Sequence, residues 1–517
     1  MRAAPPARAG AGGGSYWPVT VCVMLATVMQ AIDTTIANVA LPYMQGSLSA
    51  SLDQINWVLT SYIVAAAIMT PPTGWLAARF GRKRLFLSAV AGFTAASILC
   101  GIAQSLPEMV LFRLLQGVCG ASLVPLSQAV LLDTWPKEKH GSAMAIWGVG
   151  VMVGPILGPT LGGWLTEAYS WRWVFYVNLP FGILTFLGLS TFLAESRRKA
   201  APFDWFGFLA LSVAIGALQL MLDRGQDQDW FASAEIVGEA TVAGLAFYLF
   251  LAHTLTAERP FVNPRLFADR NFSAGLGFIF VVGIILLATL ALLTPFLQNL
   301  MGYPVLTAGM VLAPRGMGTM LMMFVVGRLI GRIDARLLIG TGFLLTALSL
   351  YEMSLFTPDI AQWDIVRTGF TQGLGFGLIF VPLSTVTFAT LPPEWRTEAT
   401  GLFSLMRNVG SSIGISVVIS LLAANTQVSH ADLAAHVTPF NPLLLAPGVA
   451  EFWNPWTAQG QAALNAVVTR QAQVIAYADD YRLMMWLTLA ALPMLLLLRG
   501  PRRDAAAPAH AAAAAAD

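Results

Sequence analysis

The sequence predicts an all-α integral membrane protein with fourteen spanning helices in a 6+2+6 arrangement, and three observations support this prediction. Of the 517 residues, 56% are hydrophobic and only 11% are charged, whereas soluble domains have about 25% charged residues. Apolar segments long enough to cross a membrane recur along nearly the whole chain. The first and last parts of the chain also resemble each other, with an additional stretch between them.

The apolar segments define the expected helices, because a helix needs about 20 mostly apolar residues to cross a bilayer. We expect fourteen of them, at residues 18–41, 54–76, 84–104, 108–132, 143–165, 172–194, 204–222, 236–256, 272–297, 304–330, 336–357, 364–390, 399–423 and 481–498. The tail 1–17 is rich in Gly and Pro, and the low-complexity tail 499–517 is predicted to be disordered.

The basic residues predict the orientation of these helices, because Lys and Arg gather in cytoplasmic loops. Most of the 29 Lys and Arg residues fall in alternate connecting segments, such as RFGRKR at 79–84 and ESRRK at 195–199. Both termini are therefore expected in the cytoplasm. The net charge of +2 gives no reason to expect a nucleic-acid partner.

An internal repeat with an offset of about 256 residues defines the domains. The matches are Gln116-Gly117 with Gln372-Gly373, Pro125-Leu126-Ser127 with Pro382-Leu383-Ser384, and Pro136-x-Glu138 with Pro392-x-Glu394; Arg113 has a near counterpart in Arg367. The repeat unit is six helices but the shift is eight, so two helices are inserted. We expect six-helix bundles at 18–194 and 272–498 and the inserted pair at 195–271. Two parallel halves around a central cavity are a transporter layout.

Two charged residues fall inside predicted spans, where an ionisable group is a functional candidate because its burial in lipid is costly. Asp33 lies about eight residues from the outer end of its helix, and Arg113 about five from the outer end of its own. Their depths differ by roughly 5 Å at about 1.5 Å per residue, so we expect them to interact. Arg113 favours the charged form of Asp33 and burial favours the neutral form, which suits a proton-coupling site. The alternative is a static ion pair.

Other polar residues in the spans are candidates for the substrate cavity, namely Gln30, Asn38, Tyr62, Gln116 and Gln128 in the first half and Arg315 and Arg407 in the second. The two arginines either bind anionic substrate groups or pair structurally. Glu239, Glu352 and His253 lie near helix ends, where water reaches them, and are weaker candidates. Twenty Met and thirty Phe residues supply apolar wall for lipophilic compounds.

The segment GVGVMVGPILGPTLGGWL, at 148–165, is unusual for a spanning helix because it is rich in helix breakers. Gly150, Gly154, Gly158 and Gly162 recur every four residues and so share one helix face, followed by Gly163. Such a face lets a neighbouring helix approach closely, and Pro155 and Pro159 are expected to bend the helix. Both ordinary helix packing and a sliding seam between the halves fit this pattern.

Four motifs in the chain resemble those of a known family. They are IDTTIANVALP (32–42), GWLAARFGRKR (74–84), RLLQGVCGA (113–121) and GVGVMVGPILGPTLGG (148–163). Together they resemble the major facilitator superfamily, and within it the fourteen-helix drug:proton antiporters of the EmrB/QacA group. The similarity extends from about residue 18 to residue 498.

The resemblance implies a function and roles for particular residues. The chain would export lipophilic drugs in exchange for protons by alternating access across the bacterial inner membrane, with no cofactor and no metal, and would confer antibiotic resistance. Asp33 would carry the coupling proton beside Arg113. The 143–165 helix would lie against the second half and resist leak. A cytoplasmic gating loop would contain Gly74, Arg79, Gly81, Arg82 and Lys83, although Ala78 stands where the family usually has an acidic residue.

One long segment, 424–480, is expected to lie outside the membrane, with a Pro-rich part TPFNPLLLAPG and a helical stretch QAALNAVVTRQAQVIAYA. A long outer loop suggests an ordered cap or a docking element. The resemblance implies a periplasmic adaptor and an outer-membrane channel as partners.

Two other functions remain open. The first is export of a single metabolite or siderophore instead of many drugs. The second, more distant, is a membrane-embedded enzyme, which is disfavoured because the five histidines form no HxxxH or HExxH pair. ATP-driven transport is disfavoured because the sequence has no GxxxxGK[ST] motif.

Overall fold

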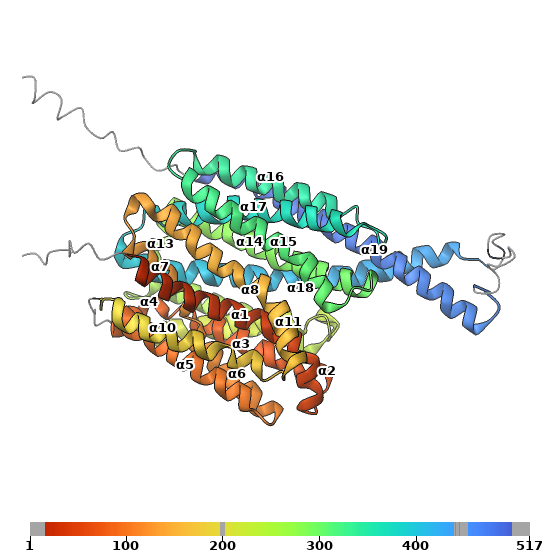
Figure 1. Ribbon diagram of the computed structural model, residues 1–517, viewed down its shortest axis with the longest axis horizontal. Coiled ribbons are helices and arrows are strands. Elements are labelled where there is room, and N and C mark those ends of the chain that lie inside the picture. Colours follow the sequence, from red (N-terminus) through yellow and green to blue (C-terminus); the bar gives the residue numbers. More distant parts are fainter. Residues whose placement is uncertain (1–15, 197–201, 439, 441–443, 445–452, 499–517) are drawn as a thin grey trace, which may run out of the picture.

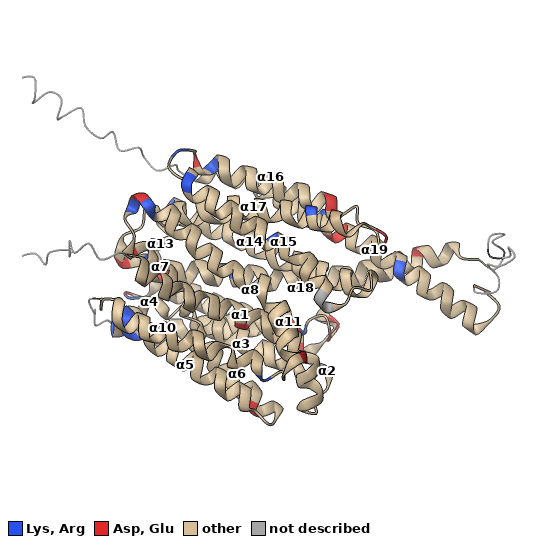
Figure 2. Cartoon of the chain, in the orientation of Figure 1, with Lys and Arg blue, Asp and Glu red and all other residues tan. Residues whose placement is uncertain are grey.

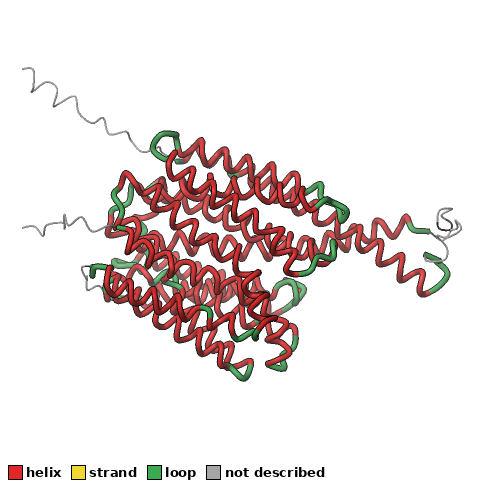
Figure 3. The backbone as a smooth tube through the Cα atoms, viewed as in Figure 1, coloured by secondary structure: helices red, strands yellow, loops and turns green. Residues whose placement is uncertain are grey.

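A computed structural model of the chain describes residues 16–196, 202–438, 440, 444 and 453–498. The described residues are almost wholly helical (Figure 3). The first half contains α1 (Trp17–Ser47), α2 (Leu52–Ile55), α3 (Trp57–Met69), α4 (Thr73–Phe80), α5 (Arg82–Ile102), α6 (Leu106–Gly120), α7 (Leu123–Thr134), α8 (His140–Ala168), α9 (Trp173–Tyr176) and α10 (Asn178–Phe192).

The inserted pair is α11 (Trp205–Arg224) and α12 (Ala234–Thr256), followed by the short α13 (Arg265–Ala268). The second half contains α14 (Arg270–Pro295), which continues as a π-helical turn (Phe296–Leu300), then α15 (Val305–Leu329), α16 (Ala335–Met353), α17 (Gln362–Ala389), α18 (Arg396–His436) and α19 (Ala458–Ala490).

Each of the fourteen expected spans coincides with one helix or a broken pair of helices. The number of spanning helices, however, is not confirmed as exactly fourteen. Twelve helical segments of the described chain are long and apolar enough to cross a membrane. The other two expected spans are α16, with 19 residues, and the pair α3 and α4. The helix breaks between α3 and α4 at Pro71-Pro72, because proline supplies no backbone donor.

The helices form two bundles that lie side by side (Figure 1). In this view α1, α3, α5, α6 and α10 form the lower bundle, α14 to α17 form the upper one, and α8 and α18 lie between them. Charged residues gather toward the two ends of the bundles and are sparse along the helices (Figure 2). This distribution fits helices that cross a lipid bilayer. We call the end with Arg82 and Arg396 the basic end, and the opposite one, where α18 and α19 protrude, the hairpin end.

The two halves meet closely at the basic end. A Cβ atom at Gly74 (α4) would lie only 2.8 Å from the Cα of Glu398 (α18). The Thr400 hydroxyl donates to the Pro125 carbonyl at 3.1 Å, and the Ser142 hydroxyl donates to the Gly327 carbonyl at 3.2 Å. These contacts hold the halves together on this side of the molecule.

The segment expected as a long outer loop is mostly helix. Helix α18 runs on to His436, well past the expected end at 423, and α19 begins at Ala458, well before the expected start at 481. Together they form a protruding hairpin (Figure 1), tied at 2.9 Å by a hydrogen bond between His430 and Asn465. The helical stretch at 461–478 lies within α19. Most of the Pro-rich part TPFNPLLLAPG lies outside the described residues.

The inserted helix α11 touches both halves near the hairpin end. From the first half, the Thr60 hydroxyl (α3) donates to the Asp223 carboxylate. From the second half, the Ser416 hydroxyl (α18) donates to the Leu222 carbonyl at 2.8 Å. Just beyond α11, the Trp230 indole donates to the Ser420 hydroxyl at 2.9 Å. The inserted pair therefore bridges the two bundles.

Candidate functional site: a buried ion pair in the first half

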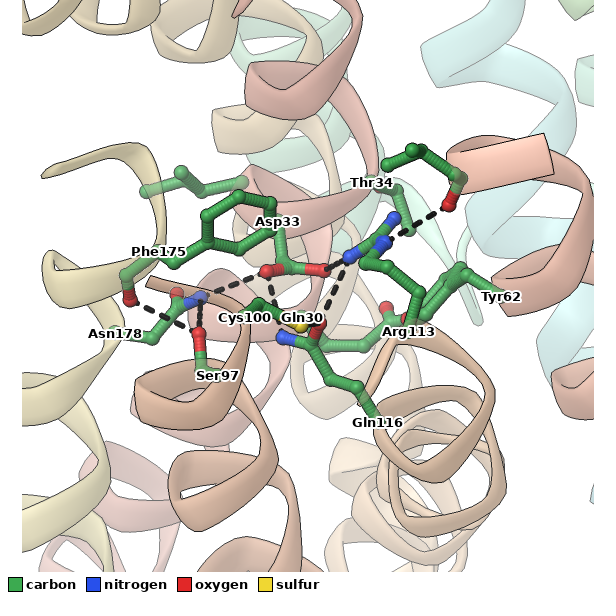
Figure 4. Close-up of polar contacts among 12 residues, drawn as sticks. Gln30, Asp33, Thr34, Tyr62, Ser97, Cys100, Arg113, Gln116, Phe175 and Asn178 are labelled. Atoms are coloured by element: carbon green, nitrogen blue, oxygen red, sulfur yellow. Dashed lines mark hydrogen bonds and ion pairs between the residues drawn. The ribbon is translucent and has the colours of Figure 1, made fainter. Parts of the chain in front are cut away.

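Asp33 and Arg113 form a buried ion pair. Asp33 (α1) and Arg113 (α6) are 0% and 1% exposed, and Arg113 Nη1 lies 2.8 Å from Asp33 Oδ2. The other carboxylate oxygen, Oδ1, accepts hydrogen bonds from Gln116 at 2.8 Å and from Asn178 at 2.7 Å (Figure 4). The two carboxyl oxygens therefore accept three hydrogen bonds from protein donors, the kind of pairing that a buried charged group needs.

Arg113 is held in place by several further contacts. Its Nε donates to the Val58 carbonyl at 3.1 Å and its Nη1 also donates to Gln116 Oε1 at 2.8 Å. The guanidinium lies 4.3 Å from the ring centre of Tyr62, whose hydroxyl accepts from Gln30 at 3.3 Å. Desolvated cation–π contacts of this kind stabilise a buried guanidinium by about 2 kcal/mol. Four helices, α1, α3, α6 and α10, thus converge on one charge pair.

Small residues bring the helices that carry this site close together. A Cβ at Gly117 (α6) would lie 2.5 Å from the Tyr62 carbonyl, and one at Gly120 would lie 3.0 Å from the Phe93 ring. Only glycine fits such close approaches of helix backbones. The motif RLLQGVCGA thus supplies both the buried arginine and the packing that brings it to α3.

Sequence reasoning missed two members of the site. Asn178 (α10) donates to Asp33, and it also donates to Ser97 (α5) at 2.9 Å. Ser97 in turn donates to the Phe175 carbonyl. The available signal was an amide inside the apolar run 172–194, where an unpaired polar group is costly.

The remaining predicted cavity residues lie in different surroundings. Gln116 and Gln128 are 0% exposed; the first belongs to the Asp33 site and the second contacts Met144 Sδ. Asn38 is exposed. Arg315 (α15) is 6% exposed and donates to the Leu286 carbonyl at 3.0 Å. Arg407 (α18) is half-buried. The structure therefore joins Gln30, Tyr62 and Gln116 to the ion pair, and leaves the others apart from it.

The glycine face of α8 packs against α1 of the same half, so its contacts are those of the ordinary helix packing that the sequence left open beside a sliding seam. A Cβ at Gly154 would lie 2.1 Å from the Ala31 carbonyl, and one at Gly158 would lie 2.0 Å from Thr35 Oγ1. Gly150 and Gly162 likewise meet Met24 and Ile36, whereas Gly163 is more open. Helix α8 continues from His140 to Ala168 through Pro155 and Pro159, whose side chains lie outside the described part.

A different face of α8 lies against the second half. Gly148 faces Met323 (α15), and a Cβ at Gly316 (α15) would lie 2.1 Å from Ile156 Cγ1. The Trp147 ring stacks with the Phe380 ring of α17, with centres 5.6 Å apart. The helix therefore does border the second half as expected, but through side chains and not through its row of glycines.

The predicted gating loop forms the turn between α4 and α5. Gly81 has φ of 91°, a backbone conformation that favours glycine, and Lys83 donates to the Ser190 carbonyl at 2.6 Å. Arg82 pairs with Asp133 (α7), and Arg396 of the second half lies 2.8 Å from the other oxygen of the same carboxylate. Asp133 thus joins the halves at the basic end. Arg79 is exposed.

The other ionisable residues singled out from the sequence are paired or peripheral. Glu352 lies 2.9 Å from Arg367. Arg367, the expected counterpart of Arg113, has a half-exposed side chain. His253 contacts Asp204 at 2.9 Å. Glu239 (α12) has one buried oxygen without a hydrogen-bond partner. Within the described residues there is no group of three or more His, Cys, Asp or Glu that fits a metal ion.

Comparison with known proteins now identifies the family. The sequence profile of the Major Facilitator Superfamily matches residues 23–415. The chain belongs to the major facilitator superfamily. The resemblance inferred from the four motifs is thereby confirmed, and the protein is a multi-pass membrane transporter of this superfamily.

Several members of the superfamily are similar over most of the chain. Multidrug export protein EmrB of Haemophilus influenzae is 38% identical over 434 residues, which is 83% of this chain and 85% of that protein. Fatty acid resistance protein FarB of Neisseria gonorrhoeae is 36% identical over 501 residues, or 95% of this chain and 97% of that one. Probable multidrug resistance protein EmrY of Escherichia coli is 34% identical over 477 residues, 91% and 93% of the two chains.

Solved structures support the fold alone. The human organic anion transporter MFSD10 superposes with a TM-score of 0.58 at 14% identity, covering 92% of this chain and 100% of that one. A bacterial homologue of the human lysosomal transporter Spinster, in an inward-facing conformation, gives a TM-score of 0.55 at 19% identity, covering 94% and 100%.

Proposed function

We propose that this transporter exports lipophilic drugs and other toxic compounds in exchange for protons, by alternating access across a bacterial inner membrane. Three relatives, named for multidrug export, multidrug resistance and fatty acid resistance, support the substrate class, and each is similar over more than four fifths of this chain. The observation that carries proton coupling is the buried Asp33–Arg113 pair at 2.8 Å.

The pair supplies chemistry suited to coupling. With Arg113 and two amides in contact, Asp33 holds a negative charge. A rearrangement that separates α1 from α6 removes the counter-charge, and burial then favours the protonated acid. Proton uptake on one side of the membrane and release on the other follow when the halves alternate. In the present conformation the 0% exposed carboxylate is shut off from water.

The basic end is assigned to the cytoplasm and the hairpin end to the periplasm. Arg82, Lys83 and Arg396 lie at the basic end. Lys and Arg are enriched on the cytoplasmic side of membrane proteins, which supports this orientation. Helix α1 begins at this end (Figure 1), and Leu498 accepts a hydrogen bond from Arg336, at the start of α16. Both termini are therefore proposed to be cytoplasmic. No step of this mechanism calls for a cofactor or a metal.

The test is pH-gradient-driven transport in proteoliposomes that contain the purified protein, with a cationic dye, an uncharged drug and an anionic uncoupler as substrates. The Asp33→Asn variant is expected to fold and bind substrate but to lose gradient-driven transport by more than about tenfold, since its amide cannot exchange a proton. Asp359→Asn, at an exposed aspartate, is the matched control. Undiminished transport by Asp33→Asn contradicts the proposal, whereas stimulation by a single metabolite or siderophore favours a dedicated exporter.

Lipophilic anions are proposed as part of the substrate range. The relative FarB is named for fatty acid resistance, and Arg407 is half-buried with no ion-pair partner that we find among the described residues. A guanidinium in such a position attracts a carboxylate. Arg407→Gln is expected to weaken transport of a long-chain fatty acid at least about fivefold while sparing a cationic dye. Equal loss for both substrates contradicts the assignment.

A periplasmic adaptor is the proposed protein partner, and through it an outer-membrane channel. The support is the helical hairpin of α18 and α19, which extends beyond the two bundles (Figure 1). The experiment is co-purification of a candidate adaptor with the full-length transporter, and with a variant in which surface positions Gln427, Asp432 and Thr469 of the hairpin are changed to Lys. Retention of the adaptor by the variant, or no capture by the wild-type protein, contradicts this assignment.

A further inference from the structure

The second half contains a counterpart of the Asp33 site, and the repeat offset of about 256 residues locates it. Asp33 (α1) corresponds to Thr289 (α14), and Gln116 (α6) corresponds to Gln372 (α17). In the first half Gln116 donates to Asp33 at 2.8 Å, and in the second half Gln372 donates to Thr289 at 3.5 Å. The same contact therefore recurs between the corresponding pair of helices, α14 and α17, with a hydroxyl in place of the carboxylate.

The arginine of this second site comes from a different helix. The residue that corresponds to Arg113 is Gly369, and a Cβ there would lie 3.7 Å from the Cβ of Arg315. Gly117 packs on the carbonyl of Tyr62, and its counterpart Gly373 packs on the carbonyl of Arg315. Arg315 thus takes the place that Tyr62 has in the first half. Its Nη2 donates to the carbonyl of Leu286, one turn from Thr289 on α14.

A carboxyl group is also present, on the last helix of the half. Asp480 (α19) is 1% exposed. It shares a buried stripe with Tyr477 and Tyr481, and the ring of Tyr477 lies 5.4 Å from that of Phe296, at the end of α14. Arg315 and Tyr481 are close enough to act on each other electrostatically. In the first half the last long helix, α10, similarly supplies Asn178 to Asp33.

The two sites differ in how their polar groups are satisfied. Both oxygens of Asp33 accept hydrogen bonds. Among the residues named here for the second site, five buried atoms have no hydrogen-bond partner: Arg315 Nη1, Gln372 Oε1, Tyr481 Oη and the two carboxyl oxygens of Asp480. The first site has one such atom, Asn178 Oδ1. Buried polar groups are normally paired, so a concentration of unpaired ones calls for an explanation. Proton binding supplies one, because it removes the charge that would otherwise lack a partner.

Neighbouring charges do not neutralise Asp480. The adjacent acid Asp479 acts on it unfavourably and is itself paired with Arg482 at 3.2 Å. Charged side chains on the helices that pack against α19 have their contacts elsewhere. Glu352 pairs with Arg367, Arg270 and Arg336 donate to carbonyls of residues 496–498, and His430 contacts Asn465. A carboxylate with no donor and 1% exposure is far less stable than the neutral acid.

We propose that Asp480 is a second proton-binding residue, which is protonated in this conformation and ionises when the second half rearranges to bring the free Nη1 of Arg315 toward it. The O–H bond of the acid breaks, the proton passes to water, and the carboxylate is stabilised by the guanidinium. Each half then contains one carboxyl group whose charge depends on an arginine, Asp33 with Arg113 and Asp480 with Arg315. The inference rests on the proposed proton-coupled function for its role in transport.

The first experiment uses the wild-type protein, so it does not depend on the folding of a variant. Dicyclohexylcarbodiimide reacts with protonated carboxyls in apolar surroundings, and peptide mass spectrometry locates the adduct. We expect labelling at Asp480 that declines as the pH rises from 5 to 9, and none at the exposed, paired Asp479. The absence of an adduct at Asp480, or a labelling rate that is the same at every pH, overturns the proposal.

The second experiment measures the protons released per substrate bound, in a weakly buffered solution of purified protein. Asp480→Asn and Asp33→Asn are each expected to lower the release by about half, and the double variant to abolish it, because binding and proton release are linked. Asp359→Asn, at an exposed aspartate, is the matched control. Wild-type release and a wild-type pH profile in Asp480→Asn overturn the second site. Undiminished release in Asp33→Asn instead counts against the proposed function, and leaves the labelling result at Asp480 standing.

Discussion

Helix α8 has two faces with opposite kinds of packing, and their difference indicates which interface is fixed and which can move. Its glycine face meets α1 backbone to backbone, with the Thr35 hydroxyl donating to the Gly154 carbonyl at 2.9 Å. Its other face meets α15 and α17 through Met323, Ile156 and the Trp147–Phe380 stack. Backbone contacts tolerate little displacement, whereas long side chains adjust by rotation. We infer that α1 and α8 move as one body and that the halves slide along the other face.

The largest effect is expected from breaking the fixed face. Gly154→Val places a side chain where the Cβ alone is 2.1 Å from the Ala31 carbonyl, so the helices must separate. We expect a loss of more than about 3 kcal/mol of stability and little folded protein, measured as the thermal unfolding midpoint in detergent. Gly163→Val is the control, because the nearest atom to its Cβ would be 4.0 Å away. Similar midpoints for the two variants would show that the glycine face is not tightly packed.

A smaller effect is expected at the face between the halves. Gly316→Ala pushes a methyl group against Ile156, at a cost of about 1 to 3 kcal/mol. The protein is expected to fold, while transport in proteoliposomes slows. Adding Ile156→Ala should restore transport, since it removes the side chain in contact. A double variant that remains as slow as Gly316→Ala contradicts a side-chain-mediated interface.

The ion pairs at the basic end test whether the halves are held by charge as well as by packing. Asp133→Asn weakens the contacts with Arg82 and Arg396. We expect the conformation closed at this end to lose about 1 kcal/mol of stability, which shifts the equilibrium roughly fivefold toward the conformation open at this end. Spin labels at the exposed Arg79 and Arg332 report the distance between the halves. Glu138→Gln, at an exposed acid near the same end, should leave the distance distribution unchanged. An unchanged distribution in Asp133→Asn would exclude a holding role for these pairs.

The smallest effect belongs to a single hydrogen bond within the fixed face. Thr35→Val removes the donor to the Gly154 carbonyl while keeping the side-chain shape, and we expect a loss of about 0.5 to 1 kcal/mol. Thr34→Val is the matched control, because the Thr34 hydroxyl bonds only to Ala31 of its own helix. Equal unfolding midpoints for the two variants would assign no stability to the contact between α1 and α8.

The sequence predicted correctly those features that depend only on position along a helix axis, that is, on depth in the membrane. The lengths of the apolar runs located the helices, and equal depth in opposite directions brought Asp33 to Arg113, which the structure pairs at 2.8 Å. Depth could not reveal Asn178, because its orientation toward Asp33 depends on how α10 rotates against α5. For the same reason the spacing of glycines in α8 identified a shared face but not the helix that it meets.

The second half was harder to interpret from the sequence. Asp480 adjoins Asp479 at the start of the last apolar run, so the pair marked a helix end, whereas α19 continues for more than twenty residues before it. Arg367 matched Arg113 by residue type, but the register of the repeat puts Gly369 there, and Arg315 supplies the buried guanidinium from α15. A substitution that moves a charge from one helix to another leaves no trace in a linear alignment of the halves.

The contacts of the inserted helix α11 impose a limit on how far the protein opens. Helix α11 is hydrogen-bonded to both bundles at the hairpin end of the molecule. Thr60 of the first bundle bonds to Asp223, and Ser416 of the second bonds to Leu222. If the bundles separate at the hairpin end, α11 must move with one of them and lose its contact with the other. Otherwise its contacts limit how far the bundles separate. The two additional helices would then set the width of the exit, and with it the largest cargo that passes.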